Sequence, residues 1–291
     1  GDPVVRNPVI RLIALVLSLQ LSACSDPHPG HTIETLRIGI LPGQSEAALR
    51  ERFTPLFEFL SQEAGLPYEL VIPGNYEELL KAFGAGEIDL GYLGGVTFVK
   101  ANTDFGAVPL VMRDVDSRFT SILVVADESI TSLSDLQDKR LGFGSRLSTS
   151  GHHMPRHFLQ VQYGIIPEQY FQSIQYSGKH DRTAYWVRDG VIEAGVVNPQ
   201  IISKMLADGR LQQGDLRTVL TTPPYTNYVW AVNPRIGPVD RERIRHAFLQ
   251  LSFDNPRHEA ILSRIGAASF YPASVEDFST LKHMMTRQGV L

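Results

Sequence analysis

The chain has 291 residues and a formal net charge of −4, with 43% hydrophobic and 20% charged residues. This length is sufficient for two domains of about 100–150 residues each. The mild acidity argues against nucleic-acid binding, which relies on a broad positive surface, so any anion site has to be local and built from fixed dipoles.

The first residues have the pattern of a secretory signal. Arg6 and Arg11 precede an apolar run over 12–21. A run of this length is typical of a signal peptide and too short for a bilayer span, which needs about 20 apolar residues.

The apolar run ends in Leu-Ser-Ala-Cys, with Cys24 as the only Cys of the chain. This ending resembles the bacterial lipobox, at which the chain is cut before the Cys and the thiol is lipidated. We expect a lipoprotein signal peptide over 1–23, a lipid anchor on Cys24 and a flexible tether over 24–34. The alternative is a buried Cys behind an ordinary signal; a single Cys excludes an intrachain disulfide in either case.

Strand-like and helix-like segments alternate after the tether. The strands are expected at 36–41, 68–72, 88–93, 107–112, 121–126, 141–144, from 173, at 191–197, 218–222 and 228–232. The helices are expected after Ser45, from Tyr76, at 97–101, at 133–140, from 148 to about 163, before 188 and at 241–252. This alternation predicts parallel sheets covered by helices.

Similar sheet units occur twice, which predicts two α/β lobes with a ligand cleft between them. We expect lobe 1 over 35–120 plus 229–291 and lobe 2 over 121–228. Hinges are expected near 119–125 and 222–230.

The segment Ser148-Thr149-Ser150-Gly151 has the chemistry of an anion site. A helix start exposes about four unpaired N–H groups and carries roughly half a positive charge, so it binds an oxyanion without Lys or Arg. The three hydroxyls add donors, and Gly151 leaves room for close approach. The alternative is a plain helix cap. Pro155 would interrupt a helix that begins at Ser148, so a separate or kinked first turn is expected.

Four segments, in this order, carry a resemblance to a known family: 36–42, 75–94, 143–151 and 177–181. Together they resemble the phosphate/phosphite/phosphonate-binding proteins of ABC importers, over 36 to about 285. The resemblance implies the two-lobed type II periplasmic-binding-protein fold, in which each lobe is a mainly parallel sheet flanked by helices. It also implies capture of a phosphorus oxyanion, ABC permease and ATPase partners, no cofactor and no enzymatic activity.

The resemblance also assigns residues to the cleft. It implies that His180 donates to the ligand from a ring nitrogen, that Gly94 donates a backbone N–H, and that Tyr76, Tyr92 and Ser121 line the cleft. The alternatives are a loop histidine, two core aromatic residues and an ordinary strand serine. The adjacent histidines 152 and 153 are assigned a structural role, and the histidine spacing does not favour a metal site.

Two departures from the family bear on the ligand. Members that bind aminoalkyl phosphonates carry carboxylates at positions that correspond here to Gln200 and Thr226, both neutral. A buried ammonium without a charged partner costs several kcal/mol. The resemblance therefore points to phosphite, phosphate or a small neutral phosphonate.

Three other functions are compatible with the sequence. The chain is alternatively the ligand-binding component of a signalling system, or a binder of another tetrahedral oxyanion. An enzyme such as a phosphatase needs a nucleophile with its base or a two-metal site, which the sequence does not indicate. The expected location is the cell envelope, facing the periplasm or exterior.

Overall fold

The computed structural model describes residue 1 and residues 32–291. The predicted lipidation site Cys24 and most of the predicted signal peptide and tether lie outside the described residues. In the described part of the chain, no helix combines the length and the apolar character needed to cross a membrane.

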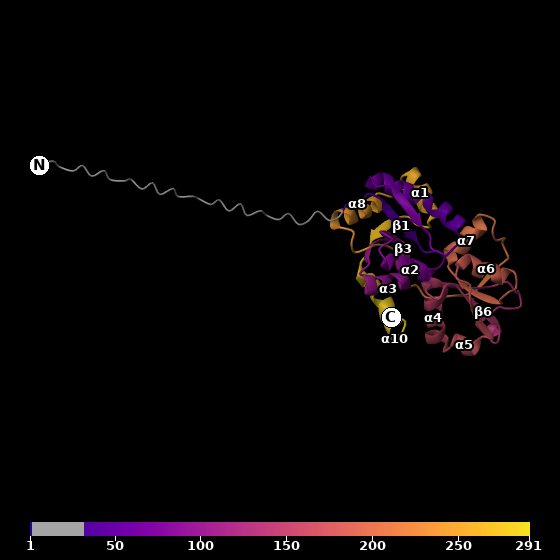
Figure 1. The fold of residues 1–291 in the computed structure, drawn as a ribbon. Helices are drawn as coiled ribbons and strands as arrows, with labels where there is room; N and C mark the ends of the chain where they lie inside the picture. The colour runs from indigo at the N-terminus through magenta and orange to yellow at the C-terminus, as the bar shows by residue number, and fades with distance from the viewer. Residues whose placement is uncertain (2–31) are drawn as a thin grey trace.

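The chain forms two sheets (Figure 1). In spatial order, the six strands of the first sheet are β11 (Phe270–Pro272), β4 (Val108–Arg113), β10 (Val229–Val232), β3 (Leu90–Leu93), β1 (Leu36–Ile40) and β2 (Tyr68–Val71). The five strands of the second sheet are β7 (Ser173–Tyr176), β6 (Arg140–Phe143), β8 (Ala194–Val197), β5 (Ile122–Val125) and β9 (Arg217–Thr221).

Helices alternate with these strands as the sequence predicts. Those in the chain segments of the first sheet are α1 (Glu46–Ala64), α2 (Tyr76–Gly84), α3 (Gly95–Phe105), α8 (Pro238–Leu249), α9 (Pro256–Arg264) and α10 (Ser279–Arg287). Those in the segment of the second sheet are α4 (Met154–Tyr163), α5 (Pro167–Tyr170), α6 (His180–Arg188) and α7 (Pro199–Ala207). Short helical turns are η1 (Asp116–Arg118), η2 (Leu133–Leu136), η3 (Thr149–His153) and η4 (Val275–Phe278).

Both sheets are mixed. β1 pairs in parallel with β2 and β3, and β6 with β7 and β8. β5 and β10 run antiparallel to both of their neighbours. These are the strands that follow each crossing of the chain from one sheet to the other, so they enter the new sheet from the opposite end. The predicted two-lobed α/β class is confirmed, but the expectation of mainly parallel sheets is wrong, because antiparallel pairings are at least as many as parallel ones in each sheet.

Each sheet has its own core. The first sheet packs around a fully buried aromatic group in which Trp230 contacts Phe53, Phe57, Tyr92 and Phe248. Separate hydrophobic clusters surround the second sheet. Each unit therefore buries its own apolar surface, which allows the two to move as bodies.

The two crossing segments lie side by side. Phe119 and Tyr225 exchange backbone hydrogen bonds of 2.8 and 2.9 Å, and the Thr222 N–H donates to Ser121 O at 3.0 Å. The Asn227 N–H donates to Asp116 O at 2.9 Å. The connection between the sheets is thus a short two-stranded ribbon.

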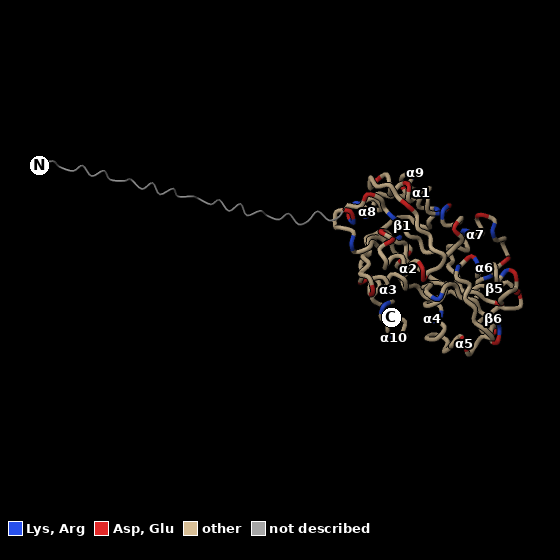
Figure 2. Tube along the Cα trace, viewed as in Figure 1, with Lys and Arg blue, Asp and Glu red and all other residues tan. Residues whose placement is uncertain are grey.

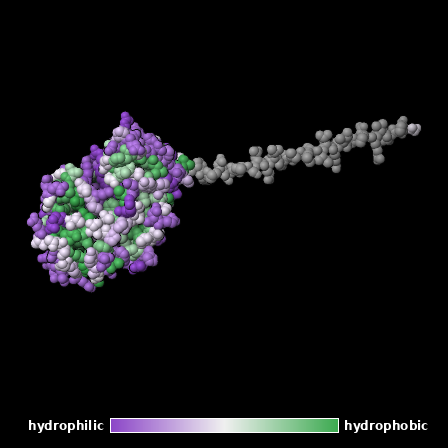
Figure 3. Space-filling model, turned by 180° about the vertical axis from the view of Figure 1, so that it is seen from behind, coloured by the Kyte–Doolittle hydropathy of each residue, from purple (hydrophilic) through white to green (hydrophobic). Residues whose placement is uncertain are grey.

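Charges of both signs are interspersed over both sheets and their helices (Figure 2). Hydrophilic residues cover much of the rear face, between smaller hydrophobic areas (Figure 3). The interspersed charges in Figure 2 form no broad region of one sign that would attract an anion from a distance, so an anion site has to rely on local geometry.

Candidate ligand-binding site

The segment Ser148–Gly151 forms a buried turn at the start of α4. The Gly151 N–H donates to Ser148 Oγ at 2.9 Å, which caps the turn. The turn is a π-helix, in which the His153 N–H reaches back to Ser148 O at 3.0 Å. The wider turn fits the expectation raised by Pro155, since proline has no N–H to donate to Gly151 O. The Gly144 N–H bonds that carbonyl instead, at 2.9 Å.

Space around Gly151 is restricted. A Cβ at this position would lie 2.8 Å from Ser148 Oγ and 3.0 Å from His180 Cε1. Ser148, Thr149 and Ser150 are at most 3% exposed. The turn therefore presents hydroxyl groups inside the protein, where a hydrogen bond to an anion is stronger than in water.

His180 begins α6 and faces this turn. Its backbone N–H donates to Gly43 O at 2.8 Å, which joins the two lobes. Its Nδ1 accepts from the Asn198 N–H at 3.1 Å, so in the neutral ring the proton is on Nε2. Nε2 lies 3.5 Å from Ser150 Oγ. Burial, and secondly the nearby Arg52, lower the pKa of His180 to about 4, so at neutral pH it is an uncharged donor.

Thr149 contacts the other lobe. The first residue of α3 follows Gly94, an N-cap without a side chain to bond the helix start. Thr149 Oγ1 accepts from the Val96 N–H at 2.9 Å and thereby caps α3 across the cleft. Gly94 is close to this contact, since a Cβ there would lie 3.2 Å from Thr149 Oγ1. The Thr149 hydroxyl thus belongs to the first residue of η3 and also caps the start of α3.

Three tyrosines, Tyr76, Tyr225 and Tyr228, are near the turn, and a fourth, Tyr92, stacks on Tyr228 at 5.0 Å between ring centroids. Tyr76 Oη would lie 3.0 Å from a Cβ on Gly43, and a hydrogen bond with Ser148 opposes the rise that burial causes in the pKa of Tyr76. The Tyr228 hydroxyl accepts from Asn198 Nδ2 at 2.9 Å. Burial likewise raises the pKa values of Tyr92, Tyr225 and Tyr228. All four are neutral, so they offer O–H donors.

The predicted cleft residues fall into two sets. Ser121 Oγ lies 2.5 Å from the hydroxyl of Tyr225, whose pKa is also affected by a hydrogen bond with Ser150. Ser121 is thus adjacent to the turn. Gln200 instead accepts from Arg113 at 2.7 Å, and Thr226 lines a separate cavity with Met154 and Leu281.

Two site residues missed at the sequence level are Tyr225 and Tyr228. Both flank Thr226 in the second crossing segment, and an aromatic residue at a predicted lobe crossing was the available signal. Their proximity to Ser150 becomes evident only in the structure, in which the ribbon brings 222–228 next to the turn.

The histidines next to the turn are buried by their own lobe. His152 Nδ1 lies 2.7 Å from Arg146 O, and its Nε2 accepts from Arg156 at 3.0 Å. Burial lowers the pKa of His152 to about 4 and that of His153 to about 3. Within residues 32–291, no three His, Cys, Asp or Glu side chains are grouped as metal ligands.

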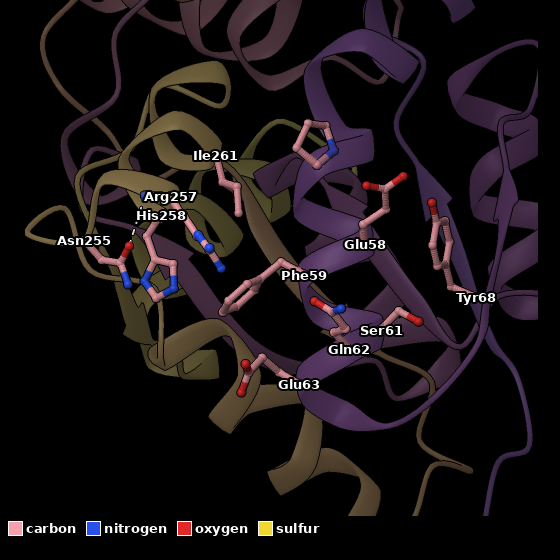
Figure 4. A pocket seen from close by; sticks show the side chains of 11 residues that line it. Glu58, Phe59, Ser61, Gln62, Glu63, Tyr68, Asn255, Arg257, His258 and Ile261 are labelled. Atoms are coloured by element: carbon pink, nitrogen blue, oxygen red, sulfur yellow. Dashed lines mark hydrogen bonds between the residues drawn. The ribbon is translucent and has the colours of Figure 1, made fainter.

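A separate cavity lies away from this turn. It has a volume of about 680 Å³ and lies between α1, β2 and α9, with Phe59 and His258 facing each other at 5.0 Å (Figure 4). All of its lining residues belong to segments of the first sheet, and they include Glu58, Glu63 and Arg257. This cavity therefore lies on one lobe and not between the two.

The comparisons with known proteins agree with this geometry. The sequence model of the family described as "ABC transporter, phosphonate, periplasmic substrate-binding protein" matches residues 38–278. The probable ABC transporter phosphite binding protein PhnD1 of Prochlorococcus marinus (strain MIT 9301) is 26% identical over 263 residues, covering 86% of this chain and 89% of that protein. Its structure with methylphosphonate superimposes with a TM-score of 0.82, covering 89% of this chain and 99% of that one.

Two further relatives span most of this chain. The phosphate-import protein PhnD of Mycolicibacterium smegmatis is 27% identical, covering 83% of this chain and 81% of that protein. The tetrathionate sensor histidine kinase TtrS of Salmonella typhimurium is 24% identical, covering 95% of this chain but only 47% of that longer protein. The match over 38–278 and the shared type II fold place this chain in the family of periplasmic substrate-binding proteins of phosphonate ABC transporters.

Proposed function

We propose that this chain captures a small phosphorus oxyanion (phosphite, phosphate or a small phosphonate) between its lobes and delivers it to an ABC permease and ATPase. The observation that carries the proposal is the group of uncharged donors around Ser150. His180 Nε2 lies 3.5 Å from its hydroxyl, and Ser150 opposes the rise that burial causes in the pKa values of Tyr225 and Tyr228.

The relatives support this ligand class. PhnD1 of Prochlorococcus marinus was solved with methylphosphonate, and the Mycolicibacterium smegmatis relative is named for phosphate import. A tetrahedral oxyanion offers several acceptor atoms, which matches hydroxyls that approach from different directions. The proposed ligand contacts are made by the turn 148–151, His180, Tyr76, Tyr92, Gly94 and Ser121.

The test of the proposal is a thermal-shift series with phosphate, phosphite, methylphosphonate, 2-aminoethylphosphonate and sulfate. A ligand that binds only the folded state stabilises it by about 2.7 kcal/mol at 100 times its dissociation constant. We expect the melting temperature to rise with at least one phosphorus oxyanion and to rise less with 2-aminoethylphosphonate. No shift with any of the five would contradict the proposal.

The proposed location is the cell envelope. The lipobox-like sequence before Cys24 and the family's periplasmic role support a chain that is anchored by lipid on Cys24. Cys24→Ser is expected to release the protein from the membrane fraction of its host. Unchanged membrane attachment would rule out the anchor.

The proposed role is binding without turnover. Among the described residues, no carboxylate is hydrogen-bonded to the Ser150 hydroxyl. The acceptor nitrogen of His180, Nδ1, already accepts from the Asn198 N–H, so Ser150 lacks a general base. Incubation with phosphate esters is therefore expected to release no phosphate. Release that depends on Ser150 would show an enzyme instead.

A signalling role is a second candidate because the tetrathionate sensor of Salmonella typhimurium matches 95% of this chain. In that role the same lobes would report ligand to a kinase partner. Purification of the chain from its host with a permease supports import. Purification with a histidine kinase, together with a thermal shift by tetrathionate, supports sensing.

The crossing segments are the proposed hinge between lobe 1 (35–120 plus 229–291) and lobe 2 (121–228). Rotation about this ribbon would open the cleft. Opening would break the hydrogen bonds that cross it, such as those from the His180 N–H to Gly43 O and from the Val96 N–H to Thr149 Oγ1. Small-angle scattering is expected to show a smaller radius of gyration with saturating ligand. Identical profiles would argue against hinge closure.

A further inference from the structure

A second buried polar group, built around Arg52 on α1, borders the cleft. The Arg52 side chain is on a residue only 7% exposed, and its Nη2 donates to Ile265 O at 3.3 Å. Within residues 32–291, no carboxylate forms an ion pair with it. A guanidinium has five N–H donors and stays charged in proteins, so Arg52 retains both charge and donors for another group.

The neighbouring Arg113 differs because its charge is already balanced. It is 2% exposed and bonds Asp116 through Nε and Nη2 at 2.9 and 2.7 Å. Its Nη1 donates to Gln200 Oε1 at 2.7 Å and to Ile265 O at 2.6 Å. The buried group as a whole keeps one positive charge, and that charge is on Arg52.

Two buried polar atoms next to these cations lack partners in the described structure, namely the Tyr92 hydroxyl and Gln44 Oε1. Both Arg113 and Arg52 oppose the rise that burial causes in the pKa of Tyr92, so its hydroxyl is near both guanidinium groups. Unpartnered buried polar atoms cost about 1–3 kcal/mol each. Such atoms beside a cation without a carboxylate indicate a place for a polar ligand group.

Arg52 also lines a cavity of about 290 Å³ between the lobes. Gln44 and Gly266 line it from one lobe, and Gln200 and Lys204 from α7 of the other. Arg264 is the third cation of the lining, which includes no acidic residue. Glu51 pairs with Lys204 and Arg264 at 3.7 and 3.4 Å, and none of the ion pairs in the described chain links it to Arg52.

Tyr228 connects this group to the turn at Ser150. Its hydroxyl accepts from Asn198 Nδ2, and Ser150 opposes the rise that burial causes in its pKa. Its ring lies 5.4 Å from the Arg113 guanidinium and stacks on Tyr92 at 5.0 Å. Tyr228 would thus lie between an oxyanion bound at Ser150 and a group bound near Arg52.

We propose that Arg52 binds an anionic group on the ligand's substituent, so that the protein takes phosphonates with a short carboxylate-bearing tail, of the phosphonoacetate type. The proposal rests on the proposed function, because the phosphonate end is placed at Ser150. The tail carboxylate supplies the counter-charge that Arg52 lacks and accepts paired N–H donors from a planar fork. An ammonium tail at this position is repelled instead.

Calorimetry with ligands of similar size tests this inference. Phosphonoacetate, ethylphosphonate and 2-aminoethylphosphonate have tails that are negative, neutral and positive. The wild-type protein is expected to bind phosphonoacetate about tenfold to a hundredfold more tightly than ethylphosphonate, because charge-assisted hydrogen bonds are strong. It should bind 2-aminoethylphosphonate most weakly.

Arg52→Met should abolish the preference for phosphonoacetate and leave ethylphosphonate affinity within about twofold, since its tail makes no charged bond. Arg50→Met is the matched control, because Arg50 is on the same helix and pairs only with the exposed Glu46. That variant should retain the wild-type ranking of the three ligands.

The outcomes separate the two proposals. Binding of ethylphosphonate without any preference for phosphonoacetate overturns the Arg52 inference and leaves the proposed function intact. A preference that persists in Arg52→Met places the tail elsewhere and also overturns it. The failure of all phosphonates, phosphite and phosphate to bind contradicts the proposed function itself. If Arg52→Met does not fold, the wild-type ranking alone decides.

Discussion

The two sides of the cleft handle charge in opposite ways. Around Ser150 every donor is neutral, including a histidine whose pKa burial lowers to about 4. Around Arg52 the donors are cationic, and the one buried carboxylate, Asp116, pairs with Arg113 and not with Arg52. Neutral donors are cheap to bury once they are bonded, whereas an unbalanced charge is costly. The first side is therefore suited to recognise the geometry of a ligand, and the second its charge.

The largest effect is expected from removing the one buried carboxylate of the charged side. Asp116→Asn leaves Arg113 buried without its counter-charge, which costs about 3–5 kcal/mol of the free energy of unfolding. Urea denaturation at pH 7 measures this loss. Asp189→Asn, which breaks the exposed pair with Arg188, is the control and should cost far less, because solvent screens exposed pairs. Equal losses in the two variants would show that burial is not the cause.

On the neutral side, single hydroxyl losses are expected to weaken ligand binding more than folding, although Thr149→Ala also removes the cap of α3. Thr149→Ala and Ser150→Ala each remove a bond to a charged ligand, worth about 1.5–3 kcal/mol, or a tenfold to hundredfold loss of affinity. Thr149→Ser keeps the oxygen at this position and serves as the control. Calorimetry with methylphosphonate or the best ligand of the thermal-shift series gives the affinities. Wild-type binding by both alanine variants would leave the turn as a helix cap only.

The neutral state of the histidines should make the fold sensitive to acid. Burial lowers the pKa of His152 to about 4 and that of His180 to about 4, below the usual value of about 6.5. The unfolded chain therefore binds more protons between pH 6.5 and 4, so stability falls as pH falls through this window. Each of these histidines should cost about 2 kcal/mol at pH 5 relative to pH 8.

Urea denaturation of the wild type and His152→Gln at pH 8 and pH 5 tests this effect. The variant should lose about 2 kcal/mol less than the wild type between the two pH values. The ratio of ligand affinities of the wild type and His180→Gln should stay constant from pH 5.5 to 8.5, because the neutral ring donates throughout. A ratio that falls toward 1 as pH rises would mean that the charged ring binds the ligand.

The smallest expected effect is a difference in the salt dependence of affinity between ligands that use the two sides. Methylphosphonate at the neutral donors should lose no more than about threefold in affinity between 50 and 500 mM NaCl, since buried interactions are screened weakly. Phosphonoacetate should lose more, because Lys204 and Arg264 at the edge of the Arg52 cavity are partly exposed. Equal salt dependence would remove the distinction between the sides.

Much of the fold was predictable because period and turn chemistry agree along the chain. The alternation of segments predicted two α/β units, and the Ser-Thr-Ser-Gly run predicted a helix start. The strand β11 was missed, since three residues paired only at a sheet edge carry too little pattern. The antiparallel direction of β5 and β10 depends on the lobe crossings, which local sequence does not encode.

The charged side of the cleft was missed although one signal was present. Arg52 is three residues after Leu49 and four before Leu56, so it interrupts the buried stripe of α1. A charge on an apolar face is either paired or functional, and this position gave a reason to search for a partner. Gln200 was assigned to the ligand by its place in the family pattern, and its contact with Arg113 required the tertiary arrangement.

The cap that Thr149 provides to α3 makes one amide a reporter of lobe separation. The Val96 N–H is bonded to a residue of the opposite lobe, at 2.9 Å, and not to its own helix. Amide hydrogen exchange requires that bond to break, so the Val96 amide exchanges only while the lobes are apart. Its protection factor would then equal the closed-to-open ratio of the protein. A single amide thus provides the conformational equilibrium that a transport partner would sense.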